Sequence, residues 1–299
     1  MKLGTFAAAL AATTIAGSAF AADLPSRKVA PVMAPIPVMT WTGFYIGLNA
    51  GYTWSGNGVA TTPLAGFFGP TWNTELATSA ALATGVDSPK SSGFIGGLQA
   101  GYNHQFGALV AGIETDIQGV IGSGSSGSRI GAGVPAAFPA ELITSSSTSS
   151  RKLDYFGTLR ARLGFVATPA FLLYATGGLA YGGAKASTSI VQFDANNGVP
   201  GNAPYGSFGS YSGTKLGWTV GAGGEWKFAQ NWSAKLEYLY YDLGSATYSS
   251  LLAFTAPPGF NPPGYGSVLS HTTKFNGHIV RAGLNYHFGG GAGPVVAKY

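Results

Sequence analysis

The charged side chains of this chain are few, and nine of them fall at alternate positions within apolar segments. Asp, Glu, Lys and Arg make up 9% of the 299 residues, against about 25% in soluble domains. Because alternate side chains of a β-strand face opposite sides of a sheet, charges spaced in this way can meet in one interior. The nine are Glu114, Asp116, Arg160, Arg162, Glu225, Lys227, Lys235, Glu237 and Arg281.

Two kinds of chemistry fit such a set of charges. One is a charged constriction that selects ions. The other is a plug of ion pairs, because an unpaired buried charge is costly. The charges fall in a chain with eight alternating segments. If these segments form an eight-stranded barrel, its interior is only wide enough for side chains, which favours the plug. The predicted register places these groups at similar heights: Glu225 with Lys235, Glu114 and Asp116 with Arg160 and Arg162, and Arg281 with Glu237.

The segments that carry these charges alternate between apolar and polar residues. The pattern recurs at residues 43–54, 93–106, 108–120, 152–166, 170–184, 214–228, 232–243 and 276–288. An apolar row on one face, with charges and glycines on the other, fits strands that face lipid outside and a narrow lumen inside. A soluble β-sandwich also alternates, but its polar face would be an open surface.

The connections between these segments alternate between short and long. The short ones lie at residues 107, 167–169 and 229–231, and the long ones, rich in Ser, Thr, Gly and Pro, at 55–92, 121–151, 185–213 and 244–273. This arrangement is typical of outer-membrane barrels. We predict an all-β fold: an eight-stranded antiparallel transmembrane up-and-down β-barrel with four long, flexible extracellular loops and three short periplasmic turns.

Aromatic residues cluster near the ends of the predicted strands, where their rings suit the headgroup zones of a bilayer. The predicted outer rim is formed by Trp54, Tyr155, Tyr181, Trp218 and Tyr240. The predicted periplasmic rim is formed by Phe44, Phe106, Phe165, Phe171, Trp226, Trp232 and Phe288.

The two ends of the chain differ from the alternating part. Residues 1–21 have the features of a secretory signal peptide: Lys2, a short apolar stretch and a small-x-small pattern that ends at Ala21. Residues 22–40 contain four prolines, which exclude a helix and favour an extended periplasmic lead-in. The barrel is then expected at 41–288 and a Gly-rich tail at 289–299.

The sequence offers little for catalysis or for a cofactor. It contains no cysteine, which excludes disulfides and thiol nucleophiles. The four histidines lack metal-ligand spacing, and we expect His278 and His287 to face inward. We therefore predict no metal, no cofactor and no catalytic residue. The net charge of +5 comes from scattered basic residues, so nucleic-acid binding is not expected.

Three motifs resemble a known family. WTGFYIG at residues 41–47, GWTVGAGGEW at 217–226 and NWSAKLEYLYYDLG at 231–244 are similar to strands of the opacity or OmpA-like family of small outer-membrane barrels of alphaproteobacteria. The signal followed by ADLP at 22–25 is similar too. The resemblance implies an eight-stranded barrel in the outer membrane, and members are described as surface antigens, porin-like proteins and, in some cases, haem binders.

The end of the predicted last strand resembles the signal that the insertion machinery reads in such barrels. It consists of Arg281, Gly283, Tyr286 and Phe288. Such barrels usually finish on the last Phe, whereas here eleven residues follow it.

These observations predict a non-enzymatic protein of the cell outer membrane with a structural and surface-display role. The alternatives are a narrow porin for small hydrophilic solutes, a surface receptor for haem (through His271 or a loop Tyr) or another ligand, and a lipid-modifying enzyme. The expected partners are outer-membrane lipids, lipopolysaccharide and, during insertion, the barrel-assembly machinery. The oligomeric state stays open.

Overall fold

The structure, a computed structural model, describes residues 39–67, 73–136, 139, 142–194, 205–254 and 266–288. The predicted signal peptide, almost all of the Pro-rich lead-in and the Gly-rich tail lie outside these residues. No helix in the described part is long and apolar enough to cross a membrane.

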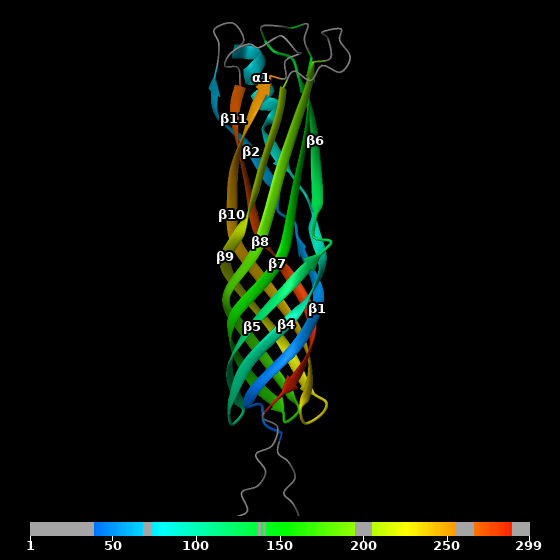
Figure 1. Ribbon diagram of the computed structural model, residues 1–299, viewed down its shortest axis with the longest axis vertical. Coiled ribbons are helices and arrows are strands. Elements are labelled where there is room, and N and C mark those ends of the chain that lie inside the picture. The colour runs from blue at the N-terminus through cyan, green and yellow to red at the C-terminus, as the bar shows by residue number, and fades with distance from the viewer. Residues whose placement is uncertain are drawn as a thin grey trace, which may run out of the picture. The chain divides into compact units, whose positions relative to one another are not determined.

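Eight long antiparallel strands form a closed ring (Figure 1). Neighbours pair in the order β1-β4-β5-β7-β8-β9-β10-β11, and β1 pairs with β11 to close the ring. Closure leaves the membrane-facing backbone groups no open sheet edge, which a bilayer would penalise. The strands are β1 (Gly43–Ser55), β4 (Ser91–Phe106), β5 (Leu109–Ile121), β7 (Ile143–Thr168), β8 (Phe171–Asp194), β9 (Tyr205–Lys227), β10 (Trp232–Phe254) and β11 (Gly266–His287).

The described residues of the four predicted loops lie mostly in strands and in one helix, so the expectation of long flexible loops was wrong for these residues. Within them lie β2 (Val59–Phe67), α1 (Asn73–Ala83), β3 (Gly85–Asp87) and β6 (Ser125–Gly133), which bring the described strands to eleven. The strands from β7 to β11 extend into the described parts of the remaining predicted loops and reach 22–26 residues. A membrane-spanning strand needs only about 9–11 residues, so each of the five extends well beyond a bilayer.

The composition of these regions misled the prediction for a physical reason. Ser and Thr are common in loops, but here they alternate along paired strands and satisfy one another. Ser150 and Ser187, which are register partners on β7 and β8, share a hydrogen bond of 2.8 Å between their hydroxyls. Ser149 and Thr188, the adjacent pair, share one of 2.9 Å on the opposite face.

Several strands are interrupted at one height, which we call the junction. It comprises residues 56–58 between β1 and β2, 88–90 between β3 and β4, 122–124 between β5 and β6, and the irregularities at 154–155 in β7 and 243–244 in β10. Cross-strand contacts tie these points together: Ser91 pairs with Ser55, and the Ser123 hydroxyl donates to the Leu153 carbonyl at 2.7 Å. Gly122 and Gly244 both take φ of 76°, which suits glycine.

The junction separates two kinds of outward surface. On the side of the short turns, which we call the membrane segment, the outward rows are apolar and exposed, with Leu163 at 69% and Leu236 at 62%. On the other side, which we call the outer wall, the exposed rows of β7 to β10 are mostly Ser and Thr, such as Thr148, Ser189 and Thr247. An apolar belt bounded by hydroxyls defines the part of the barrel that sits in lipid.

Candidate functional site

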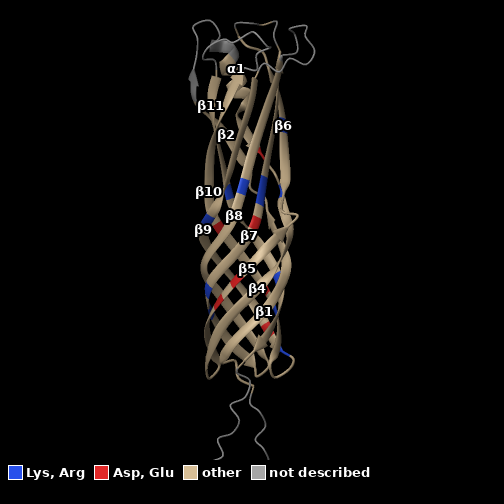
Figure 2. Cartoon of the chain, viewed as in Figure 1, with Lys and Arg blue, Asp and Glu red and all other residues tan. Residues whose placement is uncertain are grey.

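Eight of the nine predicted charged residues meet in the lumen of the membrane segment, in what we call the charged layer. Each has at most 3% of its surface exposed. Four are carboxylates and four are cations, so the layer is neutral as a whole. In Figure 2, charged positions interrupt the tan strands in the lower half of the barrel and again at mid-height. The charged layer consists of Glu114, Asp116, Arg160, Arg162, Glu225, Lys235, Glu237 and Arg281.

Two arginines hold most of the carboxylates of the charged layer. The Arg160 guanidinium donates to Glu114, to Asp116 at 3.1 Å and to Glu237 at 3.0 Å. Arg281 donates to Asp116 at 2.9 Å and, from its Nε, to Glu237 at 2.7 Å. The register contact expected between Arg281 and Glu237 is therefore present. Shared carboxylates make the two arginines parts of one network rather than two separate pairs.

The register alone does not decide every partner. Lys235 is the cross-strand neighbour of Glu225, as the turn spacing indicated. Its ammonium instead donates to both carboxylate oxygens of Glu114, at 2.8 and 2.9 Å, and Glu225 pairs with Arg162. In a lumen this narrow, a long side chain reaches an acid on another strand as easily as the one beside it.

Neutral side chains complete the charged layer, and the sequence analysis missed them. The Tyr45 hydroxyl donates to Glu114 at 2.7 Å, and the Thr158 hydroxyl donates to Asp116 at 2.7 Å. The Arg162 guanidinium lies 3.6 Å from the ring centroid of Tyr174, a cation–π contact. Each of the three neutral residues occupies an inward position of its strand, so the alternation was a usable signal.

Lys227 is the ninth predicted residue, and it lies apart from the charged layer. Its ammonium donates to the carbonyl of Thr40 and lies 4.6 Å from the ring centroid of Trp41. Trp41 is fully buried. Lys227 and Trp41 therefore fill the lumen at the end with the short turns.

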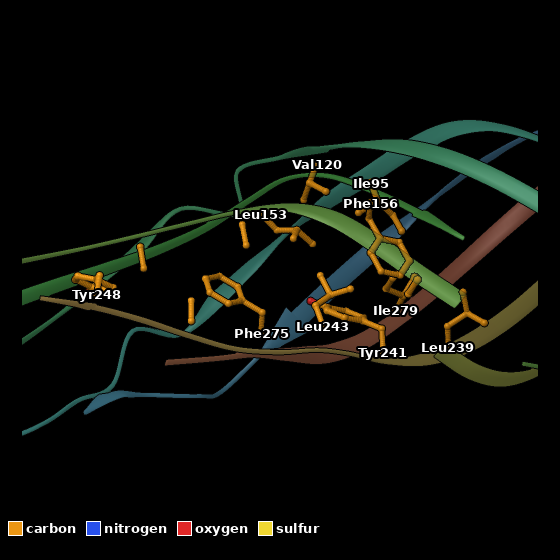
Figure 3. Close-up of a cluster of buried hydrophobic side chains, with 14 residues drawn as sticks. Ile95, Val120, Leu153, Phe156, Leu239, Tyr241, Leu243, Tyr248, Phe275 and Ile279 are labelled. Carbon is orange, nitrogen blue, oxygen red and sulfur yellow. The ribbon is translucent and has the colours of Figure 1, made fainter. Parts of the chain in front are cut away.

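An apolar layer follows the charged layer toward the junction, and the sequence analysis did not predict it. We define it as Ile95, Phe156, Leu239, Tyr241, Leu243 and Ile279, part of one buried cluster. Figure 3 shows these side chains converging inside the strands. The Phe156 and Tyr241 rings lie 4.9 Å apart between centroids, and each member of the layer is at most 5% exposed. The apolar layer is a second barrier across the lumen.

Arg151 crosses the lumen at the height of the junction. From β7 it donates to the carbonyls of Asn57 and Lys274, at 3.0 and 2.9 Å, and to the Ser55 hydroxyl at 2.7 Å. It is 3% exposed. These acceptors are carbonyls and a hydroxyl rather than a carboxylate, so Arg151 braces opposite walls without belonging to the charged layer.

The interior of the outer wall is occupied by α1. Leu76 and Ala83 of this helix pack with Ile190, Leu252 and Leu269 from the surrounding strands. Buried apolar side chains of the helix thus replace water at this height.

The edge where β3 approaches β6 is held by side chains. Asp87 accepts hydrogen bonds of 2.6 Å from both Ser147 and Ser149. Arg129 of β6 lies 3.7 Å from the Asp87 carboxylate and donates to the Leu82 carbonyl at 3.1 Å. These contacts tie β3 and the end of α1 to the wall.

The histidines do not assemble a catalytic or metal site in the described residues, where no cluster of three or more His, Asp or Glu is placed to hold a metal. His271 is fully buried, and its two ring nitrogens contact Thr61 at 2.9 Å and Ser250 at 2.7 Å. Neither nitrogen is directed to a surface ligand such as haem. His287 faces inward, but His278 does not: it lies in the outward row, stacked on Trp54 at 5.5 Å, so the expectation for it was wrong.

The residues of the predicted insertion signal end the barrel at the short-turn side. Arg281 belongs to the charged layer, whereas Tyr286 and Phe288 face outward with ring centroids 5.1 Å apart. The Phe288 amide donates to the Phe44 carbonyl at 2.9 Å, so the last strand stays paired with the first to its end. The signal itself remains a prediction.

Comparison with known proteins fits this architecture. Residues 7–288 match the model of the outer membrane protein beta-barrel domain. The 31 kDa outer-membrane immunogenic protein of Brucella melitensis is 37% identical over 93% of this chain and 96% of its own. The 22 kDa outer membrane protein of Rhizobium leguminosarum is 30% identical over 72% of this chain and 71% of its own. The solved outer membrane protein OprG of Pseudomonas aeruginosa is a distant likeness, at 10% identity over 83% of this chain and 96% of that one, with a TM-score of 0.38.

The match to the family model covers most of the chain and includes every strand of the barrel. The resemblance inferred from the strand motifs is thereby confirmed, and with it the outer membrane as the place of this protein. The chain belongs to the family of outer-membrane proteins that share this β-barrel domain.

Proposed function

We propose that this protein is a closed, non-enzymatic barrel that contributes to envelope structure and displays its outer wall at the cell surface. The observation that carries the proposal is the succession of fillings along the lumen. The charged layer, the apolar layer and α1 occupy it one after another, and the ion pairs of the charged layer are buried. Opening a path for ions would require several paired charges to lose their partners, which is costly.

Planar-bilayer recording tests the closed lumen. The purified full-length protein is expected to give no stable conductance steps. A Phe156→Ala/Tyr241→Ala variant, which removes the two rings that meet in the apolar layer, is recorded in the same way. Leu163→Ala on the lipid side is its matched control, so that a conductance seen only in the double variant is assigned to loss of the apolar layer. Stable steps in the unaltered protein, with an ion selectivity that changes in Arg160→Gln, would establish the narrow porin instead and overturn the proposal.

Surface display has a separate test, which uses the absence of cysteine from the chain. Single cysteines are introduced at Ser189 and Thr247 of the outer wall, and at Ala108 in a short turn as the control. A maleimide that cannot cross membranes should label the first two in intact cells and should label the third only after the cells are broken. If Ala108→Cys alone is labelled in intact cells, the barrel has the opposite orientation, with its short turns at the cell surface.

The names of the relatives support the surface-display part of this proposal. The Brucella melitensis protein is called an outer-membrane immunogenic protein, and this name supports the surface display that we propose for the present chain. The paired strands of the outer wall supply a fixed surface of this kind. The family name carries no catalytic activity, and the absence of enzymatic function is part of the proposal.

A further inference from the structure

Arg151 is a buried arginine without an acidic partner. Within the described residues, four guanidinium groups keep a buried N–H without an acceptor, those of Arg129, Arg151, Arg162 and Arg281. The other three contact a carboxylate, as Arg281 does with Asp116 at 2.9 Å. Arg151 is 3% exposed and contacts no carboxylate in this part of the chain. Its charge is therefore buried without a counter-charge.

The described carboxylates are all engaged elsewhere. Seven have side chains that the structure describes, and four of these form the charged layer. Asp87 accepts from two serines of β7, Asp154 is shared by two exposed lysines, and Asp242 accepts from a backbone amide. Burial of an uncompensated charge is costly. A ligand of negative charge would offset that cost at Arg151.

The free N–H groups of Arg151 lie on one edge of its guanidinium, which has five N–H donors. Nη1 donates to the carbonyls of Asn57 and Lys274, and Nη2 donates to the Ser55 hydroxyl. These bonds leave the Nε–H and one N–H of Nη2 without an acceptor among the described residues. Nε and Nη2 form an edge of the kind that binds a carboxylate or a phosphate through two parallel hydrogen bonds.

A second inward cation lies on the same side of the lumen. Arg151 pairs in register with Ala186 of β8, which pairs with Tyr211 of β9. Farther along β9 toward the membrane, Lys215 alternates with the outward Leu216, which is 79% exposed, so Lys215 faces inward. Its ammonium lies 5.4 Å from the ring centroid of Tyr211 and donates to a backbone carbonyl of β10 at 2.6 Å. Neither cation has a carboxylate partner among the described residues, so this part of the lumen is positive.

The wall beside these cations is not held by a backbone ladder. On the β9 side, no residue between Gly206 and Trp218 is paired with β10. In this stretch the side chains of Lys215 and Ser207 reach across to β10. Because no sheet hydrogen bonds close the stretch, it can part at a lower cost than the rest of the wall, whereas the apolar layer closes the lumen toward the membrane. A small solute is therefore expected to reach Arg151 from the side of the outer wall.

We propose that Arg151 anchors a binding site for a small oxyanion, of the size of phosphate or sulfate, in the lumen immediately beyond the apolar layer. The free edge of Arg151 holds two oxygens of the anion, and Lys215 raises the local concentration of anions beside the unpaired stretch. Phe275, whose ring centroid lies 5.4 Å from the guanidinium carbon, borders the site, which favours a free ion over a bulky ester. The site does not depend on conduction, because the anion enters and leaves on one side of the apolar layer.

Calorimetric titration of the full chain in detergent with phosphate and with sulfate, at constant ionic strength in chloride, tests the site. A single anion should bind per chain in preference to chloride, which has no pair of oxygens for the edge of Arg151. Arg151→Gln should weaken binding about tenfold to a hundredfold, the loss expected for hydrogen bonds to a charged group. Lys215→Gln should weaken it less. Lys90→Gln, which removes one exposed charge at the junction, is the matched control and should bind as the original protein does.

Arg151→Lys separates binding from bracing. It keeps the charge but not the two-donor edge, so it should bind each oxyanion more weakly than the original protein. The heat-dependent shift in gel mobility of each variant reports whether its barrel has folded, and Arg151→Lys carries the test if Arg151→Gln does not fold. The proposal is overturned if neither oxyanion shows saturable binding, if chloride competes as well as sulfate, or if a folded Arg151 variant binds as tightly as the original. It is overturned equally if Lys90→Gln weakens binding as much as Arg151→Gln, which would reduce the effect to net charge.

Discussion

The charged layer and the apolar layer occupy neighbouring inward positions of the same strands. On β10 the inward side chain changes from Glu237 to Leu239 over two residues, and on β11 it changes from Arg281 to Ile279. Both layers exclude water from the lumen, but they do so with different interactions. In one, each group depends on particular partners at hydrogen-bond distance; in the other, contact between apolar surfaces suffices.

This difference determines how each layer should respond to change. A buried ion pair adds little net stability while it is intact, yet removal of one partner leaves a buried charge without compensation. An apolar layer loses transfer free energy and gains a cavity in proportion to the atoms removed. Substitutions in the charged layer are therefore expected to be severe and partner-specific, and those in the apolar layer graded by volume.

The largest effect is expected from Arg160→Ala. The change withdraws donors from Glu114, Asp116 and Glu237 together, and loss of one partner in a buried network costs about 3–5 kcal/mol. Urea unfolding of the barrel in lipid vesicles measures the free energy of unfolding. Lys152→Ala at the exposed junction is the control, with a change within about 0.5 kcal/mol. A loss below about 1 kcal/mol for Arg160→Ala would mean that water already compensates the carboxylates.

A pair of leucines on β10 separates packing from simple transfer out of water. Leu239 is fully buried in the apolar layer, whereas Leu236 is 62% exposed toward lipid. Both Leu→Ala changes lose apolar transfer free energy, but only Leu239→Ala leaves a cavity, because lipid fills the space at 236. We expect Leu239→Ala to cost about 2–5 kcal/mol and Leu236→Ala distinctly less, by the same unfolding measurement. Equal losses would indicate that the apolar layer is loosely packed.

The same contrast explains what the sequence could and could not predict. Charges at alternate positions are conspicuous in a chain of this composition, so the alternation alone identifies eight members of the charged layer. The same alternation places Phe156 on the side of Arg160 and Ile279 on the side of Arg281, but it does not show that these apolar residues meet in a layer, because their packing partners come from other strands. Leu172 interrupts the polar row of its segment in the same way and is fully buried.

The outer wall escaped prediction for a different reason. Composition separates loops from strands only when strands are apolar on one face, and the outer wall has hydroxyls on both. Ser149 points inward to Asp87 and Ser150 outward to Ser187, yet both read as loop residues. Pairing partners for such residues come from distant segments, and neither composition nor local spacing reports them.

A smaller effect is expected from Tyr45→Phe, which deletes one hydroxyl at the edge of the charged layer. That hydroxyl donates to Glu114 at 2.7 Å, and a hydrogen bond to a charged group contributes about 1.5–3 kcal/mol. Because Glu114 keeps Lys235 and Arg160, we expect a loss near the lower bound. Tyr52→Phe, in the outward row of the same strand, should change stability far less. If the two variants are equally stable, the charged layer does not depend on its neutral members.

The smallest effect is a pH dependence confined to the outer wall. Burial of His271, outside the membrane segment, lowers its pKa below 6.5, and the nearby charge of Asp87 opposes this in part. The neutral ring is then favoured in the folded wall, and the unfolded wall binds a proton first as the pH falls below 6.5. The free energy of unfolding of the outer wall therefore falls as the pH drops below 6.5. It stops falling once the pH is below the lower pKa that His271 has in the folded wall.

Hydrogen exchange at pH 7 and pH 5, corrected for intrinsic rates, localises this loss. Because His271 contacts Thr61 of β2, exchange should accelerate in β2 and in α1, which packs beside it, while β1 and β5 of the membrane segment stay protected. His271→Gln, which keeps hydrogen-bonding capacity without a titratable ring, should exchange alike at both pH values. Acceleration that persists in this variant would show that a group other than His271 titrates in the outer wall. Acceleration that spreads into the membrane segment would show that the two halves of the barrel do not open independently, since the charged layer would then share the response of the outer wall.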